Sequence, residues 1–227
     1  MRNPTLKRVA KELVPPLLVR GYKAFRRSSG QTTEEVEGRE RPPAFYDRRF
    51  RKNDRWRKHY TESRYYFMWS VIADRVVRAD VESVLDIGCG PGQLAALLRD
   101  KGLKSYLGFD FSSERIEQAR VACPEFDFAL ADAFETDLFE TRSYDAVICT
   151  EFLEHVDGDT DVLAKLPSGT HFFGSVPNFP GKGHVRHFEA EQEVEDRYAP
   201  FFRSLRTDTF LRNTEGKKYF LMEGNIA

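Results

Sequence analysis

A ten-residue stretch, residues 84–93, constrains the fold of this chain more than any other feature. It reads Val-Leu-Asp-Ile-Gly-Cys-Gly-Pro-Gly-Gln. The apolar run at 83–87 predicts a buried strand, and leucines at helical spacing predict a helix over 93–100. The three glycines between them permit positive φ angles and let a ligand approach the backbone closely. Because the free N–H groups of the helix N-terminus face the same turn, this stretch predicts a ligand site in an α/β fold.

The acidic residue before the glycines narrows the class of ligand. Asp86 stands two positions before Gly88, where its carboxylate would repel a pyrophosphate and attract an ammonium or sulfonium group. The spacing of the glycines also differs from the G-x-G-x-x-G of dinucleotide sites. A glycine-rich structural turn is the alternative. The stretch resembles motif I of the class I S-adenosylmethionine-dependent methyltransferases, which runs acidic-x-Gly-x-Gly-x-Gly, and this resemblance implies S-adenosyl-L-methionine as the cofactor.

Strands and helices alternate after this stretch, which predicts an α/β fold with helices on both faces of a mostly parallel sheet. Ser112 or Ser113 is expected to cap the helix that follows the second strand. The resemblance implies the Rossmann-like sheet of class I methyltransferases, with seven strands and a reversed C-terminal hairpin. The expected strands are 83–87, 105–110, 126–131, 144–150, 170–176, 210–214 and 219–223.

The chain before this sheet divides into segments of different composition. Residues 1–29 carry eight Lys or Arg against Glu12 alone. Residues 4–27 have the pattern of a basic amphipathic helix broken at Pro15-Pro16, which predicts contact with an anionic membrane surface. A helix packed on the domain and a disordered tail are the alternatives. The predicted boundaries are a linker at 30–43, a helical cover at 44–80 with a helix over 60–77, and a methyltransferase domain at 81–227.

Composition sets limits on compartment and partners. The 227 residues have a formal net charge of −1, so no general basic field favours a nucleic acid as partner. Cys89, Cys123 and Cys149 are isolated in the sequence, which fits a reducing cytoplasm. No apolar run approaches the roughly 20 residues of a membrane span. We therefore predict a cytoplasmic protein, or one held peripherally at the inner membrane surface by its N-terminal segment.

Carboxylates end three successive predicted strands. Asp86, Asp110 and Asp132 each fall at the carboxyl end of a strand, the edge where open α/β sheets bind ligands. Asp110 is expected to accept hydrogen bonds from both ribose hydroxyls, and Phe111 to pack on adenine. The resemblance implies that position 132 binds the adenine edge, although a lone aspartate at a strand end is usually a turn former. The predicted cofactor residues are Asp86, Gly88, Cys89, Gly90, Gln93, Asp110, Phe111, Asp132, Ala133 and Glu151.

A second cluster follows the fourth predicted strand, in Thr-Glu-Phe-Leu-Glu-His-Val at 150–156. If a helix begins near Glu151, then Glu151, Glu154 and His155 share one face beside the cofactor methyl. The Glu-x-x-Glu-His pattern resembles ubiquinone-biosynthesis O-methyltransferases and small-RNA 2′-O-methyltransferases, which implies an association with a divalent metal. A histidine pair, His184 and His187, follows the fifth predicted strand.

Three roles are open for this cluster. In the first, His155 is the general base for an acceptor hydroxyl. In the second, Glu151, Glu154, His155 and a loop histidine, for which we predict His187, bind a divalent metal that lowers the pKa of that hydroxyl. In the third, the cluster only orients the local structure.

Together these features predict methyl transfer from S-adenosylmethionine to a hydroxyl of a small-molecule acceptor. A short resemblance of the N-terminus to bacterial surface-polysaccharide enzymes points to a saccharide or a lipid-linked intermediate. In the resembled family a helical cover shapes the acceptor pocket, which makes Arg64, Tyr65 and Tyr66 candidate contacts. The rival interpretations are a catalytically silent cofactor-binding regulatory protein, a metal-assisted RNA 2′-O-methyltransferase, and a nucleotide-dependent oxidoreductase or epimerase.

Overall fold

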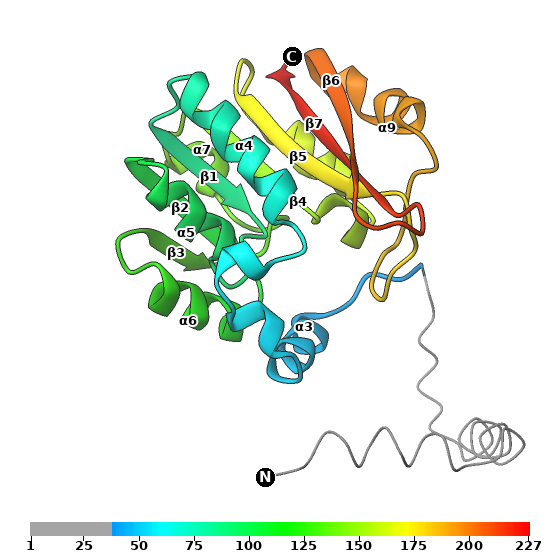
Figure 1. The fold of residues 1–227 in the computed structure, drawn as a ribbon. Helices are drawn as coiled ribbons and strands as arrows, with labels where there is room; N and C mark the ends of the chain where they lie inside the picture. Colours follow the sequence, from blue (N-terminus) through cyan, green and yellow to red (C-terminus); the bar gives the residue numbers. More distant parts are fainter. Residues whose placement is uncertain (1–37) are drawn as a thin grey trace, which may run out of the picture. The chain divides into compact units, whose positions relative to one another are not determined.

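A seven-stranded sheet forms the centre of the domain (Figure 1). The computed structural model describes residues 38–227, so the predicted membrane-contact segment 4–27 and most of the predicted linker lie outside the described residues. The order of the strands in the sheet is β3-β2-β1-β4-β5-β7-β6. The strands are β1 (Ser83–Ile87), β2 (Ser105–Asp110), β3 (Asp127–Leu130), β4 (Ala146–Thr150), β5 (His171–Pro177), β6 (Phe202–Leu211) and β7 (Lys218–Ile226).

The pairing of the strands confirms the expected α/β fold and its reversed C-terminal hairpin. β1 pairs in parallel with β2 and β4, and these neighbours pair in parallel with β3 and β5. β7 runs antiparallel between β5 and β6. Because the parallel strands point the same way, the carboxyl ends of β1 to β4 meet at one edge of the sheet.

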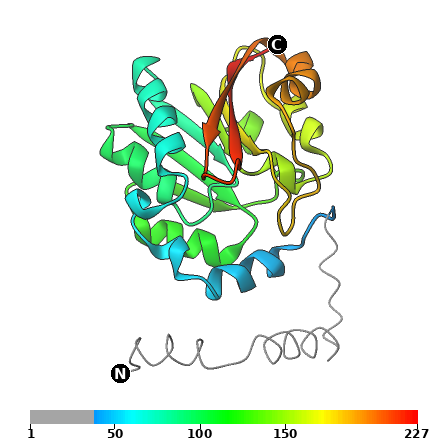
Figure 2. The same cartoon turned by 45° about the vertical axis from the view of Figure 1, so that its right-hand side comes forward.

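Helices cover both faces of the sheet (Figures 1 and 2). The α-helices are α3 (Pro43–Arg51), α4 (Tyr66–Arg78), α5 (Gln93–Asp100), α6 (Ser113–Ala122), α7 (Leu138–Thr141), α8 (Asp159–Ala164) and α9 (Glu191–Tyr198). Short 3₁₀ turns are η1 (Asp54–Arg57), η2 (Tyr60–Glu62), η3 (Leu153–His155) and η4 (Ala199–Phe201). Among the helices of residues 38–227, none has both the length and the apolar character that a membrane crossing requires.

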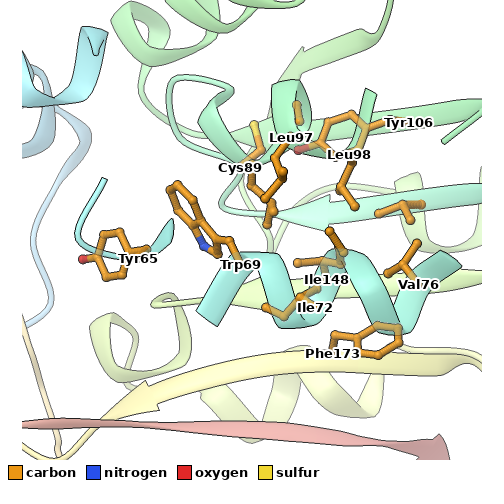
Figure 3. Close-up of a cluster of buried hydrophobic side chains, with 14 of the residues drawn as sticks. Tyr65, Trp69, Ile72, Val76, Cys89, Leu97, Leu98, Tyr106, Ile148 and Phe173 are labelled. Carbon is orange, nitrogen blue, oxygen red and sulfur yellow. The ribbon is translucent and has the colours of Figure 1, made fainter. Parts of the chain in front are cut away.

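Successive residues of β1 belong to two different cores. Val84 packs in the core beneath α4, α5 and α6, whereas Leu85 packs in the core beneath α7, α8 and α9. This alternation follows from the two-residue repeat of a strand, and it explains why the strand is apolar on both sides. Figure 3 shows Trp69, Ile72 and Val76 in one row along α4, facing the first of these cores. Each buried side chain of this kind contributes about 1.5–3 kcal/mol, which holds α4 on the sheet.

Several boundaries agree with the expectation, the ends of β3, β4, β5 and β7 shift by a few residues, and two elements differ more. β1, β2 and α5 have the predicted ends, and Ser112 caps α6 by accepting a hydrogen bond from the Arg115 N–H. The helix expected over 60–77 instead begins as η2 and starts again as α4. β6 begins at Phe202 rather than at 210, because its exposed polar residues conceal the strand pattern.

Candidate functional site

A cavity of about 310 Å³ opens at the edge where the parallel strands end. Its walls come from the glycine turn after β1, the ends of β2, β3 and β4, the cover segment of residues 40–69, and the loop 179–184 after β5. Figure 2 shows α3 and the loop after β5 on the same side of the domain, and the side chain of Arg49 donates to the Lys182 carbonyl there at 2.8 Å. The structure therefore places all the residues predicted to bind the cofactor, and His155, around one cavity.

The glycine turn after β1 leaves its central position open. Gly88 has a φ of 71°, and a Cβ atom there would lie 2.6 Å from the ring of Phe152, so this position needs glycine. Gly90 also has a positive φ, of 57°, but a Cβ atom there would meet nothing within 4 Å. The first glycine therefore permits close packing of the protein on itself, and the second leaves room for a ligand against the backbone.

Asp86 is buried beneath this turn and is poised between its charged and neutral forms. Its carboxylate accepts a hydrogen bond of 2.5 Å from the Tyr106 hydroxyl. Burial raises the pKa of Asp86 to about 7, against the hydrogen bond from Tyr106. A cation in the cavity would stabilise the ionised form, so this position suits an ammonium or sulfonium group.

Asp110, at the end of β2, is held by backbone donors. Its two oxygens accept hydrogen bonds from the Ser112 N–H at 2.9 Å and from the Gly90 N–H at 3.2 Å. The Arg115 guanidinium lies 3.4 Å away. The carboxylate is thus fixed at the glycine turn, and its remaining lone pairs can accept ribose hydroxyls.

Asp132 differs from the other two strand-end aspartates. It is exposed, and its carboxylate accepts a hydrogen bond from the Phe134 N–H at 2.8 Å, which closes an Asx turn. Ala133 beside it is buried and lines the cavity. The side chain of Asp132 therefore supports the turn that places Ala133 at the cavity wall.

Gln93 connects the glycine turn to the cover. Its side-chain amide donates hydrogen bonds to the Lys58 carbonyl at 2.7 Å and to the Arg55 carbonyl at 3.4 Å. These bonds engage the donor end of the side chain, so its amide oxygen and the backbone at the start of α5 remain for a ligand.

The segment after β4 corrects the expectation of a helix near Glu151. Glu151 has a φ of 54°, in the left-handed region that a helix cannot use, and only the 3₁₀ turn η3 follows. The N–H and carboxylate of Glu151 both bind the hydroxyl of Ser175 on β5, at 3.1 and 3.2 Å. Burial raises the pKa of Glu151 to about 7. Glu151 faces the cavity because of this strained turn, and not because it shares a helix face with Glu154.

Glu154 is the least satisfied polar side chain in the domain. It is fully buried, and neither carboxylate oxygen has a hydrogen-bond partner within the described residues. Burial, assisted by the charge of Glu151, raises the pKa of Glu154 well above its ordinary value. An unpartnered buried carboxylate is costly, so it indicates either a bound proton or a bound cation.

Two histidines present free ring nitrogens beside Glu154. Nδ1 of His155 donates to the Gly183 carbonyl at 2.7 Å, and Nδ1 of His184 donates to the Phe179 carbonyl at 3.2 Å. Burial lowers the pKa of His155 to about 3 and that of His184 to about 4, so both rings are neutral at pH 7. Ligand atoms of Glu154, His155 and His184 lie within 4.8 Å of one another.

This cluster revises the predicted metal set. His187 lies outside it, is exposed, and approaches Glu189 at 3.4 Å. Glu151 also lies outside it. The loop histidine that joins Glu154 and His155 is His184, because the turn at 181–184 carries that ring toward η3. The sequence pattern His-Val-Arg-His could not distinguish the two histidines.

The sequence reading missed the cations of the cavity. Arg49, Arg115, Arg212 and Lys217 line it, whereas among the basic residues only Arg64 was a candidate. Tyr65 lines the cavity too, but Tyr66 is exposed and packs on Tyr60 instead. These cations come from α3, α6 and the turn between β6 and β7, so no local pattern in the sequence predicts that they meet.

Comparison with known proteins places this site in a family context. A family model described as a methyltransferase domain matches residues 84–167. The ubiquinone biosynthesis O-methyltransferase of Photobacterium profundum is 33% identical over 104 residues, which are 42% of this chain and 44% of that protein. The chain thus matches less than half the length of this curated relative.

Solved structures share the fold at low identity. Magnesium protoporphyrin IX methyltransferase from Synechocystis, with bound S-adenosylhomocysteine, has a TM-score of 0.61 at 18% identity, over 82% of this chain and 100% of that one. The N-methyltransferase NodS from Bradyrhizobium japonicum, also with S-adenosylhomocysteine, has a TM-score of 0.57 at 15% identity, over 71% and 87% of the two chains. The fold is therefore one on which both these methyltransferases are built.

Proposed function

We propose that this chain, which belongs to the class I S-adenosylmethionine-dependent methyltransferases, transfers the sulfonium methyl group of S-adenosylmethionine to a hydroxyl of a small-molecule acceptor. The observation that carries the proposal is the meeting of Asp86, Asp110 and the open Gly90 with His155 in one cavity. The first three match the charges and hydroxyls of the cofactor, and His155 offers a nitrogen with a free lone pair beside them.

Each cofactor-side residue has a distinct part in binding. Asp86 takes the cationic end of the cofactor, where its raised pKa falls as the ligand charge approaches. Asp110 accepts the ribose hydroxyls from its fixed position at the turn. Phe111, half-buried at the cavity wall, packs on the adenine. The side of the cavity that holds Glu151 and His155 would then remain for the methyl group and the acceptor.

The reaction is an in-line displacement in which the acceptor oxygen attacks the methyl carbon and the sulfonium sulfur leaves as a thioether. Proximity and orientation supply most of the acceleration, because the methyl donor is already activated. Nε2 of His155 accepts a hydrogen bond from the acceptor hydroxyl, and takes its proton as the methyl carbon is attacked. The buried ring, with a pKa of about 3, is neutral before the reaction but is a weak base by itself.

The weakness of His155 as a base favours a second candidate, in which a divalent metal ion assists the same reaction. The donor set of Glu154, His155 and His184 fits such an ion. Among residues 38–227 neither Glu154 oxygen has a hydrogen-bond partner, and Nε2 of His155 lies 3.7 Å from Glu154 Oε1. In both rings the backbone carbonyl engages Nδ1, which leaves Nε2 as the ligand atom. A divalent ion held there supplies positive charge that lowers the pKa of a nearby acceptor hydroxyl. The backbone carbonyls of Gly183 and Phe179 fix the ring orientations in either case.

Calorimetry tests cofactor identity first. We expect S-adenosylhomocysteine to bind and NAD not to bind, and tight NAD binding without S-adenosylhomocysteine binding would refute the proposal. Incubation with S-adenosylmethionine and a panel of hydroxyl acceptors should then release S-adenosylhomocysteine. Cofactor binding without turnover on any acceptor would identify a silent cofactor-binding protein instead.

The metal candidate has its own test. Thermal unfolding is measured after treatment with EDTA and again after addition of Mg²⁺, Mn²⁺ or Zn²⁺. A rise in Tm that is lost in Glu154→Gln supports the ion, because a ligand that binds only the folded state stabilises it. An unchanged Tm with all three ions leaves His155 alone as the proton acceptor.

A further inference from the structure

The charges around the cavity are distributed unevenly over its two sides. The acidic side, Asp86 and Asp110, belongs to the strand ends where the cofactor is proposed to bind. The opposite side is built by α3, the residues before α4, the loop after β5 and the turn between β6 and β7. Most of its charged side chains are cationic: Arg49 and Arg64 come from the cover, and Arg212 and Lys217 come from the turn, whereas Glu40 is acidic. A cavity that is divided in this way suits two ligands of opposite charge.

Arg212 and Lys217 both pack on the ring of Phe179, and we call these three residues the platform. The Arg212 guanidinium carbon lies 4.7 Å from the centroid of the Phe179 ring, and the Lys217 ammonium nitrogen lies 5.5 Å from it. The Arg212 N–H donates to the Lys217 carbonyl at 2.7 Å, which fixes the two residues relative to each other. Within residues 38–227 neither side chain forms an ion pair. The two cations are therefore held together at the cavity. The charge of Arg212 acts on the buried Glu151 and opposes the rise in its pKa, but neither cation is in direct contact with a carboxylate of the described residues.

The cover contributes two further cations, Arg49 and Arg64, and neither forms an ion pair within residues 38–227. Arg49 donates to the Lys182 carbonyl, and Arg64 donates to the Tyr65 hydroxyl at 2.7 Å, so both bind neutral oxygens. Burial and the charges of Arg115 and Arg64 lower the pKa of Arg49. Like charges in a partly buried cavity destabilise the free protein, and an anion between them relieves the repulsion.

Two further donors in the cavity wall lack acceptors. The indole N–H groups of Trp56 and Trp69 are buried, and neither has a hydrogen-bond partner among the described residues. Both side chains line the cavity, and Trp69 is only 8% exposed. An indole can only donate, so these groups need an acceptor atom that this domain does not provide. A ligand rich in oxygen atoms would satisfy them.

The cofactor does not account for all these groups. Its amino-acid end bears one carboxylate, and one guanidinium can bind a carboxylate with both oxygens. Phe179, which carries the Arg212 and Lys217 platform, packs with its centroid 6.1 Å from that of His184, on the histidine side of the cavity. His184 in turn contacts His155, with the ring centroids 4.8 Å apart. The platform thus adjoins the histidine side of the cavity, where the acceptor is proposed to bind.

We infer that the acceptor carries an oxyanion, a phosphate, sulfate or carboxylate group, which binds at the platform of Phe179, Arg212 and Lys217 while its hydroxyl faces His155. This inference rests on the proposed methyl transfer, because it names the chemistry of that acceptor. The platform acts on binding and orientation, and it takes no part in the displacement itself. Neutral acceptors of the same size would leave its two cations unpaired and bind less tightly.

Intrinsic fluorescence gives a direct probe, because both tryptophans of the 227-residue chain line this cavity. The full chain is first saturated with S-adenosylhomocysteine, and sodium sulfate or sodium phosphate is then titrated against sodium chloride of equal ionic strength. We expect a saturable emission change with the oxyanions and none with chloride. Arg212→Gln combined with Lys217→Gln should weaken oxyanion binding by at least about tenfold.

A matched control removes the same two charges elsewhere. Arg203→Gln with Lys101→Gln changes exposed residues that do not line the cavity, and it should leave oxyanion binding unchanged. Calorimetry should show that S-adenosylhomocysteine binds all three proteins with affinities within about threefold of one another. This measurement stands apart from turnover, so it separates a failure of the inference from a failure of the proposed function.

Two results would overturn the inference. One is an absent oxyanion response in a protein that binds S-adenosylhomocysteine normally, which leaves methyl transfer possible with a neutral acceptor. The other is competition, in which sulfate weakens S-adenosylhomocysteine binding in proportion to its own binding. Competition would assign the cations to the carboxylate of the cofactor.

Discussion

The two sides of the cavity differ in how the chain builds them. The cofactor side comes from consecutive strand ends and turns within residues 86–133, and its charged groups are carboxylates together with Arg115, which pairs with Asp110. The acceptor side gathers residues from 40–69, 179–184 and 212–217, and its charged groups are mainly cations. The cofactor side is therefore a local product of the sheet, whereas the acceptor side exists only once distant segments have folded together.

This contrast separates binding of the cofactor from recognition of the acceptor. The strand-end carboxylates and the glycine turn suit one cofactor, and their geometry follows from the parallel strands themselves. The acceptor side stands on loops and a cover helix, which can change without disturbing the sheet. Substitutions on the two sides should therefore affect different measurements, binding of the cofactor on one side and turnover on the other.

The largest effect is expected on the acceptor side. His155→Ala removes the free nitrogen beside the acceptor, so kcat for methyl transfer should fall by about 100-fold to 10,000-fold. Affinity for S-adenosylhomocysteine should change by less than about threefold, because the ring faces the Glu154 and His184 cluster. Steady-state kinetics and calorimetry on the same protein provide the two values. Equal losses in both would indicate that His155 only supports the structure.

The two loop histidines provide a matched pair for this prediction. His184→Ala disrupts the cluster and should lower kcat strongly, whereas His187→Ala changes an exposed ring outside it and should leave kcat within about threefold. The same assay measures both. If His187→Ala proves as damaging as His184→Ala, the cluster described above does not form the reactive site.

The next largest effect is expected on the cofactor side. Asp110→Ala removes a buried acceptor for two ribose hydroxyls, so S-adenosylhomocysteine should bind about 100-fold more weakly. Asp132→Ala removes an exposed carboxylate that closes its own turn, and its effect should be less than about fivefold. Calorimetry on the two variants checks the difference. Similar losses of affinity in both variants would show that the two carboxylates contribute equally to binding, although one is buried and the other is exposed.

The same contrast explains which parts of the molecule could be predicted from sequence. The glycine turn, β1, β2 and α5 have strong local signals, namely an apolar run, glycines and helical spacing of leucines, and their bounds were predicted correctly. Glu151 shows the limit of such signals. A helix could equally follow β4 in sequence, but hydrogen bonds to Ser175 on a neighbouring strand hold Glu151 at a positive φ.

The residues of the acceptor side could not be predicted from the sequence, because only tertiary contacts bring them together. Arg212 and Lys217 lie in an ordinary hairpin turn, and only the pairing of β7 with β5 brings them to Phe179. The choice between His184 and His187 likewise depends on the turn at Gly181, where the His184 N–H donates to the Gly181 carbonyl at 3.0 Å. Such contacts are tertiary, so neither periodicity nor motif spacing reveals them.

The smallest expected effect is the pH dependence of S-adenosylhomocysteine affinity, which tests whether Asp86 contacts the ammonium group of the ligand. The pKa of Asp86 in the free protein is about 7, and an adjacent ammonium group should lower it in the complex. Binding below pH 7 must then release a proton, so affinity for S-adenosylhomocysteine should rise about tenfold between pH 6 and pH 8 and level off above that. Calorimetry across this range measures the slope.

Asp86→Asn isolates the contribution of this carboxylate. Glu151 also has a pKa of about 7, so any part of the pH dependence that persists in the variant belongs to it or to another group.

The raised pKa of Asp86 means that the folded free protein keeps the Asp86 proton up to a higher pH than the unfolded chain does. Its contribution to stability therefore decreases as pH rises from about 4 toward 7, and the cofactor should restore it. A parent protein whose affinity stays flat from pH 6 to pH 8 would show that the cationic end of the cofactor lies away from Asp86.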